Sequence, residues 1–117
     1  MAAIDVRFLR SVIDSIPTEV LVADLEHTIV FMNRAAVSHY SEGEALLGTN
    51  LLDCHNAESN RVILEVLDAL RAGEDERLIT DNEKHRVYMR AVRDTDGTLV
   101  GYYERYESPA PAGDRAA

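Results

Sequence analysis

The sequence is poor in several features that mark particular protein classes. It has one cysteine, Cys54, no tryptophan, and no apolar stretch near the ~20 residues that a membrane-spanning helix needs. One cysteine cannot form an intrachain disulfide, and no CxxC or CxxCH motif is present. The first residues lack the basic segment and apolar run of a signal peptide. These absences predict a cytoplasmic protein without a membrane partner.

Positive charge is also scarce. The 12 basic residues are outnumbered by 21 acidic ones, which gives a net charge of -9. Binding to DNA or RNA depends on clustered Lys and Arg that neutralise phosphates, and anionic membrane surfaces attract the same residues. The sequence contains no such cluster. We therefore expect no nucleic acid and no membrane as a partner.

Motifs of catalysis are absent as well. No glycine-rich phosphate loop, no HExxH and no recognised nucleophile motif occurs in the chain. The sequence therefore predicts that the protein is not an enzyme. A small enzyme on an open α+β sheet, such as an isomerase or a dehydratase, is an alternative that requires His55 buried in a deep cleft beside a titrating group.

The clearest pattern that is present lies between Val20 and Asn33, in the segment VLVADLEHTIVFMN. Apolar residues alternate on both sides of Glu26 and His27, which predicts two strands joined by a tight turn. Asn33 is suited to cap a helix that extends to about Tyr40, because its side chain can accept a hydrogen bond from the first helical turn. A hairpin that leads straight into a helix is typical of a sensor fold, and it predicts a binding module.

Two further helices are predicted from apolar residues at helical spacing. The first covers residues 4–16 and ends at Pro17, since the residue before a proline is disfavoured in the α conformation. The second covers about residues 57–72, follows the candidate cap Asn56 and stops at Gly73. The apolar stripe of the first helix is wide enough to contact a second partner in addition to its own sheet.

Three strands are predicted after the second helix. They cover residues 76–80, 84–93 and 98–107. Asp96 and Gly97 mark the last reversal, and Asp-Gly between alternating runs is a strong hairpin signal. Hairpins at both ends of the chain predict a five-stranded antiparallel sheet with the helices on one face, which is an α+β fold.

These elements, in this order, resemble a PAS domain. Three segments carry the resemblance, which covers about residues 11–107: VADLEHTIVFMNRAA, LLGTNLLDCH and VYMRAVRDTDGTLVGYYERYE. Asp24, Asn33 and Ala35 match the acidic residue and the Asn-x-Ala that are common in the family. His27 stands where a turn glycine is usual, so this turn must form without the freedom of glycine at positive φ.

The segment before the long helix is similar to a PAS subgroup with adjacent Cys and His at this place. Here these are Cys54 and His55, and Asn56 stands where a proline often follows in that subgroup. The resemblance divides the chain into three parts. They are an N-terminal amphipathic dimerisation helix at 1–17, a PAS domain at 18–107, and a disordered tail or linker at 108–117.

The resemblance implies a non-enzymatic sensory or interaction module of signal transduction. PAS domains hold small molecules or cofactors between sheet and helices, or hold nothing, and pass a signal to an effector protein or domain. They often dimerise through an N-terminal helix, which implies a homodimer. The expected contacts are Ile4, Phe8, Leu9, Val12 and Ile13. A module that only dimerises, without a ligand, is the second hypothesis.

A ligand pocket in this fold would lie between the sheet and the helices. Such pockets are mostly apolar with a few polar groups, for which Cys54 and His55 are the candidates. Phe31 and Met32 are alternatives, because a one-residue slip of the strand exchanges its two faces. The predicted lining residues are Phe31, Tyr40, Leu52, Cys54, His55, Ile63, Leu67, Met89 and Tyr103.

The sequence leaves the cofactor of this pocket open. Cys54 or His55 could ligate the iron of a haem in a gas or redox sensor, which is the leading specific alternative. Otherwise Cys54 is a small buried hydrophobe, and His55 forms a hydrogen bond near the helix end. A reactive flavin cysteine is not expected, since Cys54 has no adjacent Lys or Arg to lower its pKa. No separate metal site is predicted.

The remaining histidines and tyrosines are placed by their positions in the elements. His27 and His85 stand at element ends, so we expect both to be solvated. In the last strand, Tyr102 and Tyr106 share one face and Tyr103 lies on the other, because side chains alternate along a strand. One set should contact the helices, and the other should face outward or contact a dimer partner.

Overall fold

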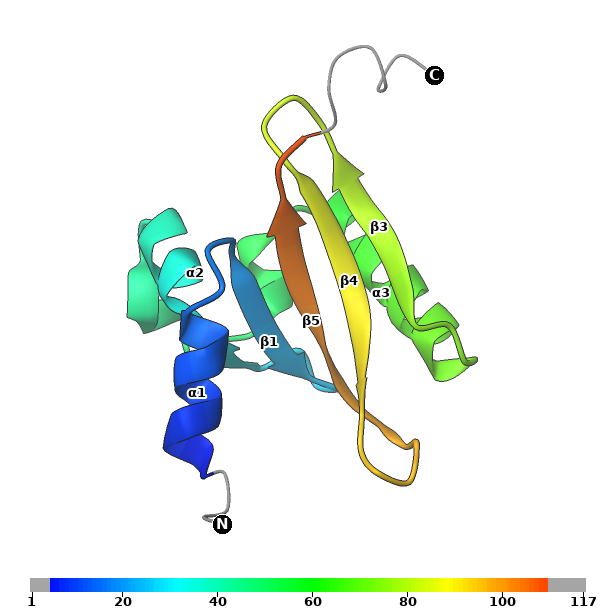
Figure 1. Ribbon diagram of the computed structural model, residues 1–117. Helices are drawn as coiled ribbons and strands as arrows, with labels where there is room; N and C mark the ends of the chain where they lie inside the picture. Colours follow the sequence, from blue (N-terminus) through cyan, green and yellow to red (C-terminus); the bar gives the residue numbers. More distant parts are fainter. Residues whose placement is uncertain (1–4, 110–117) are drawn as a thin grey trace.

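A computed structural model describes residues 5–109 of the chain (Figure 1). Its elements are α1 (Val6–Asp14), β1 (Val20–Asp24), β2 (Ile29–Met32), α2 (Arg34–His39), the 3-10 helices η1 (Gly43–Leu46) and η2 (Leu51–Cys54), α3 (Ala57–Arg71), β3 (Glu76–Asp81), β4 (Arg86–Arg93) and β5 (Leu99–Glu107). The predicted helices and strands are present, with ends shifted by about one or two residues. The predicted contact Ile4 and residues 110–117 of the predicted tail lie outside the described part of the chain.

The strands form one antiparallel sheet in the order β2-β1-β5-β4-β3. The first and last strands of the chain, β1 and β5, are therefore neighbours. This arrangement confirms the predicted five-stranded antiparallel sheet. We call the side of the sheet that α3 covers behind β3 and β4 the inner face, and the opposite side the outer face (Figure 1).

The hydrophobic core lies between the inner face and helices α2 and α3. Alternation along the strands decides which residues enter it, because neighbouring side chains point to opposite faces. Leu21 and Ala23 of β1 pair with Glu104 and Tyr102 of β5, so all four side chains belong to the inner face. The core cluster comprises Leu21, Ala23, Ile29, Met32, Ala36, Leu46, Leu51, Ile63, Val66, Leu67, Leu70, Met89 and Tyr102.

Asn33 joins α1, the first hairpin and α2. It is fully buried, and its Oδ1 accepts hydrogen bonds from the backbone N–H of Val20 at 3.0 Å and of Ala36 at 2.9 Å. Its Nδ2 lies within 3.3 Å of the carbonyl oxygens of Ile13, Ile16 and Thr18. The predicted helix cap is thus present, and the same side chain also anchors the end of α1.

The turn between β1 and β2 uses His27 in place of glycine. The backbone of His27 has φ +67°, in the left-handed region, and the Asp24 carboxylate accepts from the N–H groups of Glu26 and Thr28. The His27 side chain is buried, with its Nδ1 2.8 Å from the hydroxyl of Tyr102. The prediction that His27 is solvated was therefore wrong, because this turn directs the imidazole back over the sheet.

Within residues 5–109, no helix combines the length and the apolar character that crossing a membrane requires.

Candidate functional site

Two adjoining cavities lie at the inner face of the sheet. The larger, of about 360 Å³, is bounded mainly by β1, β2, η1, η2 and Tyr40 at the end of α2, and the smaller, of about 140 Å³, by α3, β3 and β4. Both cavities are lined by His55, Glu104 and Tyr106. These three residues therefore form the wall between the cavities, and they are the centre of the candidate site.

Glu104 is the most unusual residue of this wall. It lies on β5 between Leu21 of β1 and Met89 of β4, and only 4% of its surface is exposed. Among the described residues, none forms a hydrogen bond or an ion pair with its carboxylate. Burial raises the pKa of Glu104, and the nearby His55 opposes this shift. A buried acid without a partner is energetically costly, and such residues are candidates for function.

Tyr40 and Tyr106 form a polar pair next to Glu104. Their hydroxyl oxygens are 2.5 Å apart. Burial raises the pKa of Tyr106 to about 12, and it raises that of Tyr40 further, with Tyr106 and Glu104 contributing. In such a pair one hydroxyl donates to the other, so the second O–H remains free to donate to another group.

The position of His55 follows from the segment that precedes it. Backbone bonds from Leu51 N–H to His27 O and from Ile29 N–H to Thr49 O fix this segment along the first hairpin. Asn50 caps η2, and His55 follows at its end.

The hydrogen bond of His55 also defines its tautomer. Its Nδ1 donates to the carbonyl of Leu51 at 2.9 Å, since a carbonyl only accepts. In neutral His55, Nε2 is therefore an acceptor, and it has no hydrogen-bond partner among residues 5–109.

Other rings gather around Tyr106. The ring centres of His85 and His39 lie 4.8 Å and 5.3 Å from that of Tyr106, and His39 also contacts Tyr40 at 4.9 Å. The Nδ1 atom of His39 is 3.8 Å from a carboxylate oxygen of Glu19. His85 is half-buried and lines the smaller cavity, so it is solvated only in part. The part of the site around Tyr106 is therefore formed by aromatic rings.

The charged residues that line the cavities are all acidic. Glu42 and Asp53 line the larger cavity, Glu58 lines the smaller one, and Glu104 lines both. Among residues 5–109, no Lys or Arg lines either cavity. The electrostatic potential of the site is therefore negative unless its histidines are protonated.

Several predicted pocket residues line these cavities. Tyr40 and Cys54 line the larger, Ile63 the smaller, and His55 both. Leu67 and Met89 are buried in the core behind them, and Leu52 packs against that core.

Two predicted pocket residues lie on the wrong side of the sheet. Val22 of β1 pairs with Phe31 of β2 and with Tyr103 of β5, and all three point to the outer face. Met32 and Tyr102 take the inner positions instead, and both are buried. The prediction of Phe31 and Tyr103 was one residue out of phase, because a hydrophobic strand pattern does not reveal which face turns inward.

The environment of Cys54 also differs from the prediction of a buried hydrophobe. Cys54 is an exposed free thiol at the edge of the larger cavity. Partial burial raises the pKa of its thiol, and Glu42 and Asp53 raise it further. It is therefore a poor nucleophile and a poor thiolate ligand at neutral pH. His55 is also exposed, so the buried histidine that the enzymatic alternative requires is not present.

The residues present do not fit a haem. A haem carries two propionate carboxylates, and the cavities offer an unpaired buried acid and further acidic residues in place of Lys or Arg. Cys54, one of the two candidate ligands, has a raised thiol pKa. No group of three or more His, Cys, Asp or Glu side chains within residues 5–109 is arranged to hold a metal ion.

Sequence reasoning missed Glu104 and Tyr106 as members of the site. A usable signal was nevertheless present in β5, where Tyr102, Glu104 and Tyr106 occupy alternate positions. An acid between two aromatic residues on one strand face becomes a buried acid when that face turns inward. Once Tyr102 is known to point inward, Glu104 must do so as well.

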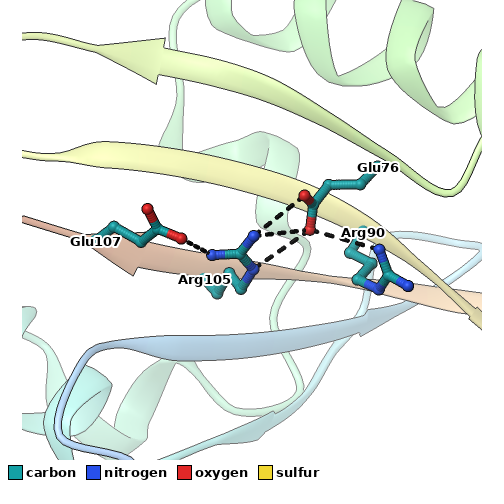
Figure 2. A network of polar contacts seen from close by, with 4 residues as sticks. All are labelled: Glu76, Arg90, Arg105 and Glu107. Atoms are coloured by element: carbon teal, nitrogen blue, oxygen red, sulfur yellow. Dashed lines mark hydrogen bonds and ion pairs between the residues drawn. The ribbon is translucent and has the colours of Figure 1, made fainter. Parts of the chain in front are cut away.

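The outer face carries its charges in pairs (Figure 2). Arg105 donates to both carboxylate oxygens of Glu76, at 3.0 and 3.1 Å, and Arg90 approaches the same carboxylate at 3.7 Å. Arg105 also contacts Glu107, and its guanidinium lies 4.3 Å from the ring centre of Tyr88.

An apolar groove lies beside these ion pairs, between α1 and the outer face. It has a volume of about 600 Å³, and one side is formed by Ile13 of α1 and by Ile16, which follows the helix. On the sheet it is lined by Val20, Val22, Val92 and Tyr103. The α1 helix (Val6–Asp14) has no buried residue, and Val6, Phe8, Leu9 and Val12 are exposed.

The comparisons with known proteins agree with this geometry. A family model described as a PAS domain matches residues 9–107, so the chain belongs to the PAS family. A search of curated protein sequences found no match.

Solved structures give the same fold. The C-terminal domain of a Streptococcus mutans protein has a TM-score of 0.72 at 20% identity, covering 90% of this chain and 85% of that chain. The PAS domain of BvgS from Bordetella pertussis has a TM-score of 0.66 at 19% identity, covering 94% and 90%. A sensory box sensor histidine kinase from Vibrio cholerae has a TM-score of 0.63 at 16% identity, covering 90% and 92%.

Membership of the family fixes the general class of function. PAS domains are typical sensor modules of signal transduction, and they are generally not catalytic.

Proposed function

We propose that this PAS domain is a sensory module that binds a small organic molecule in the two inner cavities. The observation that carries the proposal is the buried carboxylate of Glu104 in the wall between them, which accepts no hydrogen bond from residues 5–109. A pocket lined by apolar and aromatic groups, with a few polar atoms that converge, is the usual form of a small-molecule site. Here the polar atoms belong to Glu104, His55 and the pair Tyr40–Tyr106.

Mass spectrometry tests this proposal most simply. Native spectra of the purified protein should show an added mass that denaturation releases, or a screen of small molecules should find compounds that shift the NMR signals of cavity residues. Val62→Phe should block binding, because Val62 lines the smaller cavity. Leu64→Phe on the same helix is the matched control, since Leu64 is exposed and outside both cavities. Binding that is equal in the two variants, or no bound compound in either assay, would favour an interaction role instead.

We also propose that the domain forms a homodimer through α1. The helix exposes 58% of Phe8 and 50% of Leu9, and such a patch on a helix is typical of a protein interface. The occupant is a second copy of the chain, because the exposed stripe and the apolar groove on the outer face are complementary in character. Asp5 and Asp14 balance Arg7 and Arg10 along the helix, so two copies can meet without the repulsion expected from the net charge of -9.

The strand β5 is a physical connection between the two proposed sites. Glu104 and Tyr106 line the inner cavities, while Tyr103 and Arg105 line the groove beside α1. A ligand that displaces Glu104 would move its neighbours on the same strand, and so alter the surface against which α1 and its partner pack. This is how a signal would reach an effector protein or domain.

Light scattering coupled to gel filtration tests the dimer. Phe8→Glu and Leu9→Glu should convert the dimer to a monomer, because each places a charge in the apolar interface. Ser11→Glu adds the same charge at an exposed polar position of α1 and should leave the mass unchanged. A wild-type protein that is monomeric at all accessible concentrations contradicts the proposal, as does a dimer that survives both substitutions.

A further inference from the structure

The charges on the two faces of the sheet point to the chemistry of the ligand. On the outer face, Glu76 and Glu107 are both paired with Arg105. On the inner face, no Lys or Arg among residues 5–109 pairs with Glu104, and the one group of opposite sign that acts on its charge is the exposed imidazole of His55. Apart from acidic residues, only histidines of the described chain can contribute charge to the cavities. The described part of the protein therefore supplies no permanent cation to balance the charge of Glu104.

We propose that the inner cavities bind a small molecule that carries a protonated amine or amidine on an aromatic or apolar body, with the cationic nitrogen paired to the carboxylate of Glu104. This inference rests on the proposed ligand-binding function and deepens it. It assigns Glu104 as the residue that selects the class of ligand.

Energetics favour a cation at this position. An ionised carboxylate that is buried without a partner is strongly disfavoured, and burial accordingly raises the pKa of Glu104. A ligand ammonium group supplies both the opposite charge and the missing hydrogen bonds. Charge-assisted hydrogen bonds of this kind are shorter and about twice as strong as neutral ones. A neutral ligand gains less, and an anionic ligand is repelled.

The remainder of the wall suits the same class of ligand. The rings of Tyr106 and His85 border the smaller cavity, and an aromatic face attracts a cation. In its neutral form, His55 offers an acceptor at Nε2, which can receive a second N–H of the ligand. The acidic side chains Glu42 and Asp53 line the larger cavity and raise the local concentration of cations.

The size of the smaller cavity sets the scale of the ligand. Its volume is about 140 Å³. An engineered apolar protein cavity of about 150 Å³ binds benzene, so this volume can hold one aromatic ring. An aromatic ring with a short aminomethyl arm thus matches the cavity and places its nitrogen at the wall that contains Glu104.

Three probes of the same shape test the proposal: benzylamine, benzyl alcohol and benzoate. They are titrated into the full chain at roughly pH 7.5, where the amine is protonated, and binding is followed by NMR and by calorimetry. Benzylamine should bind most tightly, benzyl alcohol more weakly, and benzoate not measurably. Glu104→Gln should weaken benzylamine binding about 10- to 100-fold, and it should leave benzyl alcohol within about threefold of its wild-type affinity.

Glu107→Gln is the control, since it removes a carboxylate from the same strand on the outer face. It should leave all three affinities unchanged. Circular dichroism verifies the fold of each variant, and the ranking of the three probes on the wild-type protein tests the proposal without any substitution.

The outcomes separate this inference from the proposed function. If benzyl alcohol or benzoate binds the wild-type protein as tightly as benzylamine, or if Glu104→Gln leaves benzylamine binding unchanged, the amine assignment is overturned while the ligand-binding function stands. If no probe binds and a neutral or anionic molecule is found with the purified protein, the amine assignment is again overturned and the ligand-binding function again stands. If no probe binds and no added mass is found, both proposals fall.

Discussion

Glu76 and Glu104 show how differently the two faces of one sheet treat the same side chain. On the outer face, the carboxylate of Glu76 receives Arg105 at 3.0 Å and has Arg90 nearby (Figure 2). On the inner face, Glu104 is almost fully buried and has no partner among the described residues. Arg105 is adjacent to Glu104 in sequence, yet alternation along β5 sends its guanidinium to the outer face. The difference teaches that the inner acid, unlike Glu76, is not held by an ion pair with Arg in the described part of the chain.

A second buried polar residue shows the opposite behaviour. Asn33 is as deeply buried as Glu104, but its amide oxygen and nitrogen contact five backbone groups. Buried polar groups are normally satisfied in this way, and an exception calls for an explanation. Asn33 is therefore a structural residue, whereas Glu104 is the residue for which we propose a role in binding. The following predictions, in order of decreasing effect, test this contrast.

The largest effect is expected from Asn33→Ala. The substitution leaves buried N–H and C=O groups of the α1–β1 connection and of α2 without partners, so the free energy of unfolding should fall by about 2–4 kcal/mol. Urea denaturation followed by circular dichroism measures it. Asn56→Ala removes an exposed helix cap with one side-chain hydrogen bond, to the N–H of Ser59, and should cost about 1 kcal/mol. Equal losses in the two variants would show that Asn33 is only a local cap.

Glu104→Gln should have the opposite sign. Removing a buried charge that has no partner should increase the free energy of unfolding at about pH 8 by roughly 1–3 kcal/mol, provided no ligand is bound. The pH dependence follows from the raised pKa. Below the ordinary value of 4.5, Glu104 is protonated in both the folded and unfolded chains, so the burial of its charge costs nothing.

As the pH rises above 4.5, the unfolded chain releases the proton first, and wild-type stability falls until the pH passes the raised pKa of the folded chain. The advantage of Glu104→Gln over wild type should therefore be small at low pH and grow as the pH rises. Denaturation curves at a series of pH values measure it. A variant that is less stable than wild type at pH 8 would mean that Glu104 has a stabilising partner, and the contrast with Asn33 would be lost.

A smaller loss is expected from Glu76→Gln on the outer face. The pair with Arg105 is partly exposed, so its removal should lower the free energy of unfolding by about 0.5–1 kcal/mol at low salt, and by less at high salt. Urea denaturation at two salt concentrations measures this. Glu65→Gln, at an exposed pair with Arg61 in the middle of α3, is the control and should have no measurable effect. A loss that does not respond to salt would indicate packing rather than charge.

The smallest net effect is expected from His27→Gly. Glycine relieves the left-handed backbone at φ +67°, worth about 1–2 kcal/mol, but it removes the buried hydrogen bond to Tyr102, worth about 0.5–1.5 kcal/mol. The two terms should nearly cancel in wild type. In a Tyr102→Phe background the hydrogen bond is already absent, so His27→Gly should be more favourable there by about 1 kcal/mol. The absence of any coupling in this double-mutant cycle would show that the hydrogen bond contributes nothing.

The parts of this structure that the sequence predicted depend on local interactions. Asn33 and Asn56 cap their helices where the sequence placed them, and the five strands occur where alternating runs were found. The antiparallel order was predictable because hairpin turns join neighbouring strands at both ends of the chain. The candidate site was predicted in part, since Tyr40, Cys54, His55 and Ile63 do line the cavities.

The parts that could not be predicted depend on a choice between two equivalent faces. Phe31 and Tyr103 were placed inside, and they lie outside, because β2 and β5 carry apolar or aromatic residues on both faces. For the same reason the sequence did not identify Glu104 as a site residue, because its burial depends on which face of β5 is covered by helices. The approach of Tyr40 to Tyr106, which are 66 residues apart, has no local signal either.

The sequence by itself determined the element order, the helix caps and the antiparallel α+β class, because caps, turns and periodicity are set by residues within a few positions of each other. Only the tertiary structure decided that Glu104 is buried without a hydrogen bond or an Arg or Lys partner from residues 5–109, that Arg105 lies across the sheet from it, and that two tyrosines meet beside it. These facts depend on which face of each strand is covered by helices, and that is decided by packing among residues far apart in the chain.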